Sequence, residues 1–203
     1  MPRTALLSLL VFGALAFGWR SLVHYRRTGS TGFRGFTGRP GSAEWLGGAL
    51  FAATCVLSLV APVADLLGLV GRVEILDRPG VHVIGLVLFL LGLTGTLWAQ
   101  LAMGDSWRVG VDTEERTALV RRGPFQLVRN PIFTAMLAGI GGVALMVPNA
   151  VALLSVVLLV IGLELHVRLV EEPYLLRTHG TAYRDYAAGT GRFVPGVGRL
   201  RVA

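Results

Sequence analysis

Four charged side chains lie at the end of the last strongly apolar segment of the chain: Glu164, Arg168, Glu171 and Glu172. Each of the three glutamates is three or four residues away from Arg168, so an α-helix would carry all four on one face. A charge that faces lipid costs ~3 kcal/mol, so we expect this face to meet protein or a water-filled cavity. Arg168 either pairs with Glu164 or Glu172 and only neutralises charge, or it holds an anionic group while a carboxylate holds hydroxyl or amino groups.

A second polar group precedes the neighbouring apolar segment, where Gly123-Pro124 and Asn130-Pro131 form turn signals at the two ends of a short stretch. Pro131 is well placed to open a helix with Asn130 as its cap. A helix start exposes unpaired amides that suit a carboxylate or a phosphate. The alternative is an ordinary structural cap.

Beyond the charged face, Pro173 removes one helical hydrogen bond and disfavours helical geometry at Glu172. We therefore expect a bend there that frees the Leu169 carbonyl and turns the next segment along the membrane surface. A helix break at Gly180 should follow, with Thr181 as the cap of a second turn.

Two tyrosines on that second turn, Tyr183 and Tyr186, lie on neighbouring positions. They are either interfacial aromatics or the wall of a cofactor pocket. His166 points away from the Glu164 side by helical geometry, which favours a packing role over that of a base. No His/Cys/Asp/Glu arrangement has metal-ligand spacing, so no metal site is predicted. The lone Cys55 lies in an apolar run and excludes an intrachain disulfide.

The composition indicates that membrane helices position these groups. Of 203 residues, 53% are hydrophobic and 15% charged, against about 25% charged in soluble domains. A net charge of +7 suits anionic headgroups or an anionic substrate. The charges lie beside apolar spans instead of on a basic soluble face, so no nucleic-acid partner is expected.

Five apolar segments predict an all-α polytopic membrane protein with about five transmembrane helices, at roughly 4–24, 45–70, 80–103, 131–147 and 149–169. The last two are joined by Pro148-Asn149 and should form an antiparallel hairpin. Glycines in the fourth segment permit a close helix approach or a tilted, shallow crossing. The chain is expected to be one integral-membrane domain over 1–203, and its oligomeric state is left open.

The arginines predict the orientation. With the N-terminus outside, sixteen of the nineteen arginines fall on the cytoplasmic side, which leaves Arg3, Arg72 and Arg78 outside. Both polar groups and the C-terminus are then cytoplasmic, in the inner membrane. The Gly/Ser/Thr-rich loop 28–42 is either a flexible connector or a cover over a substrate entrance with Phe33 and Phe36 in the interface.

Taken together, the motifs resemble the isoprenylcysteine carboxyl methyltransferase family of integral-membrane methyltransferases and the related phospholipid methyltransferases. The matching pattern runs from Gly-Pro-aromatic and Val-Arg-X-Pro, across an apolar hairpin, to Arg-X3-Glu and Gly-X2-Tyr-X2-Tyr. The residues that carry it are Gly123, Pro124, Phe125, Val128, Arg129, Pro131, Arg168, Glu172, Gly180, Tyr183 and Tyr186. The resemblance covers about residues 100–195. Asn130 stands where the family usually has His, and Pro173 is not the common choice after the glutamates.

The resemblance implies S-adenosylmethionine (SAM) in a pocket formed by residues 104–203, with residues 1–103 supplying three further spans. It implies a lipophilic or prenylated acceptor, most simply a carboxylate, that arrives from the membrane lipid. Arg168 would orient that carboxylate, and Glu172 would hold polar groups of cofactor or acceptor. The predicted cofactor border consists of Gly123, Pro124, Phe125, Val128, Arg129, Asn130, Pro131, Glu171, Tyr183 and Tyr186. Two alternatives remain: a membrane NAD(P)H-dependent reductase of the sterol-reductase type, and a small transporter or scaffold.

Overall fold

The computed structural model describes residues 1–32, 38–107 and 118–200, and across these ranges the chain is helical with no β-strand. The predicted positions Phe33 and Phe36 lie outside the described residues. The N-terminal helix comprises α1 (Pro2–Phe12), a π-helical stretch (Gly13–Trp19) and α2 (Arg20–Thr28). Next come α3 (Ala43–Leu66), α4 (Pro79–Met103) and a 3-10 turn (Gly104–Ser106). A second 3-10 turn (Gly123–Gln126) precedes α5 (Pro131–Met146) and α6 (Ala150–His166). A π-helical turn (Val167–Glu171), α7 (Glu172–His179) and α8 (Thr181–Gly189) complete the described helices.

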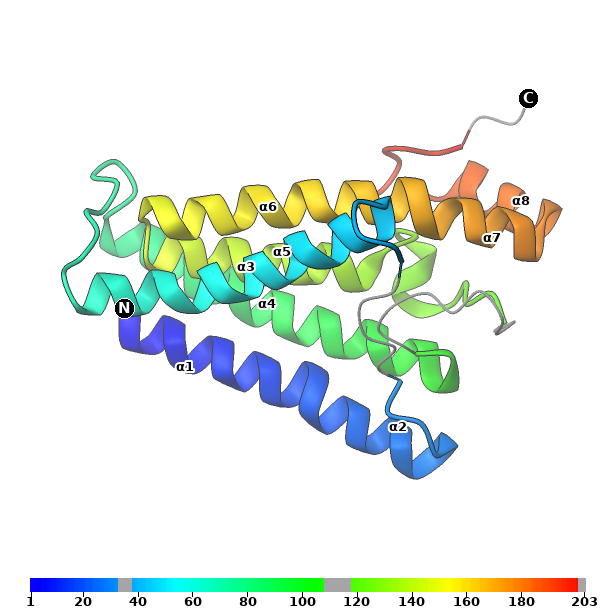
Figure 1. Ribbon diagram of the computed structural model, residues 1–203, viewed down its shortest axis with the longest axis horizontal. Coiled ribbons are helices and arrows are strands. Elements are labelled where there is room, and N and C mark those ends of the chain that lie inside the picture. Colours follow the sequence, from blue (N-terminus) through cyan, green and yellow to red (C-terminus); the bar gives the residue numbers. More distant parts are fainter. Residues whose placement is uncertain (33–37, 108–117, 201–203) are drawn as a thin grey trace.

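The helices form one elongated bundle in which successive long helices alternate in direction (Figure 1). Four of them are long and apolar enough to cross a membrane, and α5 is a shorter apolar helix. This confirms the predicted polytopic all-α class. The starts of α3 and α5, the end of α4, and α7 and α8 all lie at the end of the bundle opposite to the N-terminus (Figure 1). We call this the site end.

Glycines bring α4 and α5 into direct backbone contact. A Cβ atom built on Gly92 would lie 2.4 Å from the Gly139 nitrogen, and one on Gly85 would lie 2.6 Å from the Gly142 carbonyl oxygen. Small residues of this kind let membrane helices approach closely. The predicted close approach of the glycine-rich helix is therefore confirmed. The partner is α4, because α5 packs mainly along α4 while its hairpin neighbour α6 packs mainly along α3.

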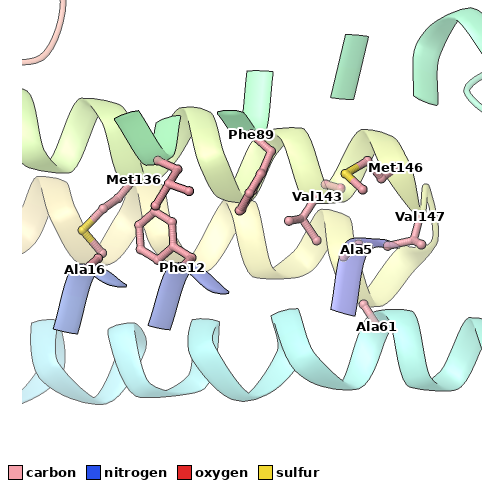
Figure 2. Close-up of a cluster of buried hydrophobic side chains, with 12 residues drawn as sticks. Ala5, Phe12, Ala16, Ala61, Phe89, Met136, Val143, Met146 and Val147 are labelled. Carbon is pink, nitrogen blue, oxygen red and sulfur yellow. The ribbon is translucent and has the colours of Figure 1, made fainter. Parts of the chain in front are cut away.

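The apolar core lies between α1, α4 and α5. Figure 2 shows Phe12, Phe89 and Met136 pointing into this space, and the Phe12 and Phe89 ring centroids are 6.2 Å apart. At the end of the bundle far from the site, the Asn149 side chain caps α6 by accepting from the Ala152 amide at 3.0 Å and donates to the Ala61 carbonyl at 3.1 Å. The predicted turn at Pro148-Asn149 is thereby tied to α3.

Arg20 fastens the N-terminal helix to the site end. Its guanidinium donates to the Gly104 carbonyl at 2.6 Å and lies 4.6 Å from the centroid of the Trp107 ring. The side chain is buried, and these contacts give it a hydrogen-bond acceptor and an aromatic face, which offset part of the cost of burying a cation.

The last long helix differs from the prediction at Pro173. The chain stays helical to His179, and α7 follows α6 through the π-helical turn without a break (Figure 1). A π-helical turn accommodates the proline, with the Glu172 amide bonded to the Val167 carbonyl five residues earlier. The predicted break at Gly180 is confirmed, since its φ of 53° ends α7. Gly180 also holds the cap position of α8, so Thr181 is the first helical residue and not the cap.

Candidate functional site

A cavity of about 550 Å³ opens among the helices at the site end. This volume falls within the ~300–1,000 Å³ range of small-molecule sites. Its polar end is lined by Glu44, Asn130, His166, Glu171, His179, Tyr183 and Tyr186. Its apolar lobe extends between α3, α5 and α6, where Phe51, Ala52, Cys55, Met136, Leu159 and Leu163 line it. We call the whole space the site cavity. It joins a polar recess to a membrane-embedded apolar space.

A buried ion-pair network fixes one wall of the site cavity. Arg129 donates to Glu172 with an Nη2–Oε1 distance of 2.6 Å. Arg192 donates from Nε to Oε1 of Glu172 at 2.8 Å and from Nη2 to Oε2 at 2.9 Å. These bonds raise the pKa of Arg192. Both oxygens of Glu172 are thus occupied by arginines, and its predicted contact with cofactor or acceptor stays a prediction.

Arg129 also binds the C-terminal segment. Its Nη1 donates to the carbonyls of Ala187, at 3.1 Å, and Thr190, and Nη2 donates to the Gly198 carbonyl at 3.0 Å. These three carbonyls and Glu172 are the acceptors for the two terminal nitrogens of a guanidinium whose side chain is only 2% exposed. Arg129 therefore joins the start of α5 to α7 and to the chain beyond α8.

The predicted cap of α5 is confirmed in position, with Asn130 at the cap and Pro131 in the first turn. The Asn130 side chain makes no cap bond; its Nδ2 donates to the Arg192 carbonyl at 3.1 Å. The Asn130 and Arg129 amides donate to the carbonyls of Arg192 and Gly191, at 3.1 and 2.8 Å. These amides are therefore engaged by the C-terminal segment.

The two tyrosines of α8 belong to the cavity wall. Their ring centroids are 6.2 Å apart in an edge-on arrangement. The Tyr186 hydroxyl donates to the Phe125 carbonyl at 2.5 Å, which fastens the 123–126 turn to α8. Burial raises the pKa of Tyr183 to about 12, with Glu172 adding to the rise. Burial, with Tyr183 nearby, likewise raises the pKa of Tyr186 to about 12.

The four charged residues of the last long helix do not share one face. Glu164 and Arg168 pair with each other, and the Arg168 side chain is 56% exposed. Glu171 lines the site cavity, whereas Glu172 is buried between the arginines. The physical reason is the π-helical turn over Val167–Glu171. It adds one residue to a turn, so spacing counted on a regular α-helix assigns the wrong side to the residues at its end.

His166 is a site residue that sequence reasoning did not select. As predicted, it points away from Glu164, but that side of the helix is the one that lines the site cavity. Its Nε2 lies 3.3 Å from Oε1 of Glu171.

The predicted cofactor border is partly brought together. The members that line the site cavity are Phe125, Arg129, Asn130, Pro131, Glu171, Tyr183 and Tyr186. Gly123 and Pro124, in the 3-10 turn, and Val128 are not among the lining residues, and Val128 forms a bridge to Gly191. Arg168 is outside the wall as far as the structure describes it. Within the described ranges no cluster of metal-ligating side chains occurs.

The described helices thus define a helical membrane protein with a cavity that polar and apolar side chains line together. The sequence pattern of the phospholipid methyltransferase family matches residues 81–182, half of the chain. The chain therefore belongs to the phospholipid methyltransferase family. This family is grouped with the isoprenylcysteine carboxyl methyltransferases among integral-membrane methyltransferases, so the predicted resemblance is confirmed at that level. No curated protein matches the chain.

Proposed function

We propose that this membrane protein transfers the methyl group of SAM to a lipophilic acceptor that enters the site cavity from the bilayer. The observation that carries the proposal is the continuity of the cavity from the polar end to the apolar lobe. The family match spans α4 to the start of α8 and so includes most of the cavity wall. A water-soluble cofactor and an apolar acceptor can then meet inside one space between the helices.

The polar end suits SAM. When bound, SAM supplies an electrophilic methyl group on a sulfonium cation. Glu171 and Glu44 offer negative charge to the cation and to the amino group of the cofactor. Phe125, Tyr183 and Tyr186 offer aromatic faces, which attract cations and stack on an adenine ring. Methyl transfer from a sulfonium depends on in-line positioning and on exclusion of water, which the apolar side chains of the cavity wall favour.

The acceptor occupies the apolar lobe in this proposal. The resemblance predicts a carboxylate, as in a prenylated cysteine. Arg129 is the one arginine on the described cavity wall, and Glu172 engages it. Among the described residues, Arg168 could meet a carboxylate in the cavity only by leaving Glu164 and turning inward. A lipid or other amphiphile that presents nitrogen, oxygen or sulfur needs no such change.

The position of the cavity at the site end also bears on which side of the membrane the site faces. The protein is an integral membrane protein, and we propose that the site end faces the cytoplasm of the inner membrane, where SAM is available. The arginine distribution supports this orientation.

Calorimetric titration of the detergent-purified protein with S-adenosylhomocysteine (SAH), with NADPH in parallel, tests the cofactor. Saturable micromolar binding of SAH alone is the expected result. Binding of NADPH alone would support the reductase, for which Arg121 and Arg122 could contact the 2′-phosphate. Binding of neither would support a transporter or scaffold.

Glu171→Ala should weaken SAH binding about tenfold, the value of one charge-assisted hydrogen bond. Glu164→Ala, seven residues earlier and outside the cavity, is the matched control.

A further inference from the structure

His166 and Glu171 are brought together by the π-helical turn. The turn covers Val167–Glu171, and its hydrogen bonds join residues five apart. The two side chains are also five residues apart, with Nε2 of His166 3.3 Å from Oε1 of Glu171. Regular α-helical geometry would not align residues five apart on one face. Short π-helical turns inside α-helices frequently mark functional sites.

The imidazole occupies a niche in the cavity wall that requires a glycine on α3. A Cβ atom built on Gly47 would lie 3.1 Å from the His166 Cβ and 3.4 Å from Nδ1. On the α5 side the Phe133 ring meets the imidazole edge-on at 6.3 Å between centroids. Gly47, Phe133 and His166 all line the site cavity. The ring is thus held in place while it borders the cavity.

Two carboxylates act on the imidazole, against the burial that disfavours its charged form. Glu171 accepts from Nε2 and so assigns the lone pair of the neutral ring to Nδ1. Glu44, at the start of α3, acts on His166 electrostatically as a second carboxylate. From α5 the facing side chain is the uncharged Phe133. An imidazolium formed here would be stabilised by both carboxylates, as in other carboxylate-oriented histidine bases.

We propose that His166 is the general base of the methyl transfer, with Glu171 as its positioning residue. The acceptor is then one that loses a proton: an amine or a thiol on an apolar chain. This inference rests on the proposed function and narrows its acceptor. A nitrogen or sulfur lone pair forms the bond to the methyl carbon. The carbon–sulfur bond breaks, and its electron pair stays on sulfur to give SAH. The acceptor proton passes to Nδ1 of His166. A carboxylate acceptor would need no base.

The test uses the full-length protein in detergent with radiolabelled SAM and three probes: dodecylamine, dodecanethiol and dodecanoic acid. Wild type should methylate the amine or the thiol. His166→Gln should lower kcat for that probe about 100-fold or more, as general bases contribute ~10²–10⁴, while SAH binds as in wild type. The kcat of wild type should rise with pH as the imidazole loses its proton, and the variant should lack this rise. Added imidazole should restore activity to His166→Ala.

The matched control is His82→Gln, because His82 also pairs with a carboxylate, Asp77, at 3.0 Å. His82 is near the start of α4, which lies at the end of the bundle opposite to the site (Figure 1). His82→Gln should keep kcat. Gly47→Ala provides a second variant that crowds Nδ1 and should lower kcat without loss of SAH binding.

The proposal is overturned if His166→Gln keeps kcat within fivefold of wild type. It is also overturned if wild type methylates only dodecanoic acid, or if it methylates neither dodecylamine nor dodecanethiol. Should His166→Gln not fold, an unchanged kcat in Gly47→Ala and a flat wild-type pH profile would overturn it. Failure of wild type to bind SAH would instead refute the proposed function.

Discussion

Arg129 and Glu172 form a buried ion pair, with 2.6 Å between Nη2 and Oε1, although 43 residues separate them in the chain. Arg192 completes the network from the segment beyond α8. The start of α5, the start of α7 and the C-terminal segment are therefore held by one carboxylate. The cavity wall depends on this network, because Arg129, Asn130 and Tyr183 line the space beside it.

Glu172→Gln should destabilise the protein. Loss of the charge leaves two arginines without their counter-ion, and removal of one partner of a buried pair costs about 3–5 kcal/mol. SAH binding should weaken as a consequence, because the wall loosens. Thermal unfolding in detergent measures the change. Glu164→Gln, on a partly exposed ion pair, is the control and should cost no more than about 1 kcal/mol. Equal unfolding temperatures for the two variants would contradict the structural role of Glu172.

Arg168→Ala separates the two acceptor classes. Its guanidinium pairs with Glu164 at an exposed position, and such pairs contribute about 0–1 kcal/mol. Methylation of an amine or thiol probe should therefore fall by less than about tenfold. Loss of activity toward a carboxylate probe would show that Arg168 turns inward and holds the acceptor, as the resemblance implies. Radiolabelled methyl transfer to dodecylamine and dodecanoic acid distinguishes these results.

Gly92→Ala should disrupt the α4–α5 contact. The added Cβ would meet the Gly139 nitrogen at 2.4 Å and the Ala135 carbonyl oxygen at 2.6 Å, and backbone cannot move aside as a flexible side chain can. Overpacking of this kind costs about 1–3 kcal/mol or more. Gly141→Ala is the matched control in α5, because its Cβ would come no nearer than 4.0 Å to Leu88. The Tm of Gly92→Ala in thermal unfolding should be well below the Tm of Gly141→Ala. The opposite order would exclude this packing of α4 against α5.

Alkaline pH should weaken the wall formed by α8. The pKa of Tyr186 is about 12 in the folded protein, because of burial, against ~10 in an unfolded chain. A raised pKa means that the folded state favours the neutral phenol, so this stabilisation is complete below pH ~10 and is lost as the pH rises through about 12. Tyr186→Phe should reduce the tyrosinate absorbance that appears near pH 12. If the variant and wild type give the same absorbance titration, Tyr186 does not ionise near pH 12 and the prediction is wrong.

The spans and their order could be predicted from the sequence because each depends on local information. Apolar runs defined the helices, and Pro131 marked the start of α5 with Asn130 as its cap. The site was less predictable. The side on which Glu171 and Glu172 lie depends on the π-helical turn before Pro173, which spacing on a regular helix does not contain. Arg192 joins Glu172 through a tertiary contact with a segment whose sequence, Gly-Thr-Gly-Arg, resembles an ordinary loop.

His166 shows the same limit in another form. Helical geometry predicted its direction correctly, but the prediction assigned the cavity to the side that carries Glu164 and Arg168. Which side of a helix meets a cavity depends on the neighbouring helices, here on Gly47 of α3 and Phe133 of α5. Neither residue carries a local signal that links it to His166.

The orientation in the membrane is open to a direct test. Arg72 at the far end is paired with Asp65 and Asp77, at 2.8 and 3.1 Å, so little positive charge is left there. The helix α2, whose last turn carries Arg26 and Arg27, lies at the site end (Figure 1). Positive residues are retained on the cytoplasmic side during insertion, so a fluorescent reporter fused after the last residue should fluoresce and an alkaline phosphatase fused there should be inactive. Both reporters inserted after Gly71 should give the reverse results. Active phosphatase at the C-terminus would place the site end outside the cell, away from SAM, and would remove the support for a cytoplasmic methyl transfer.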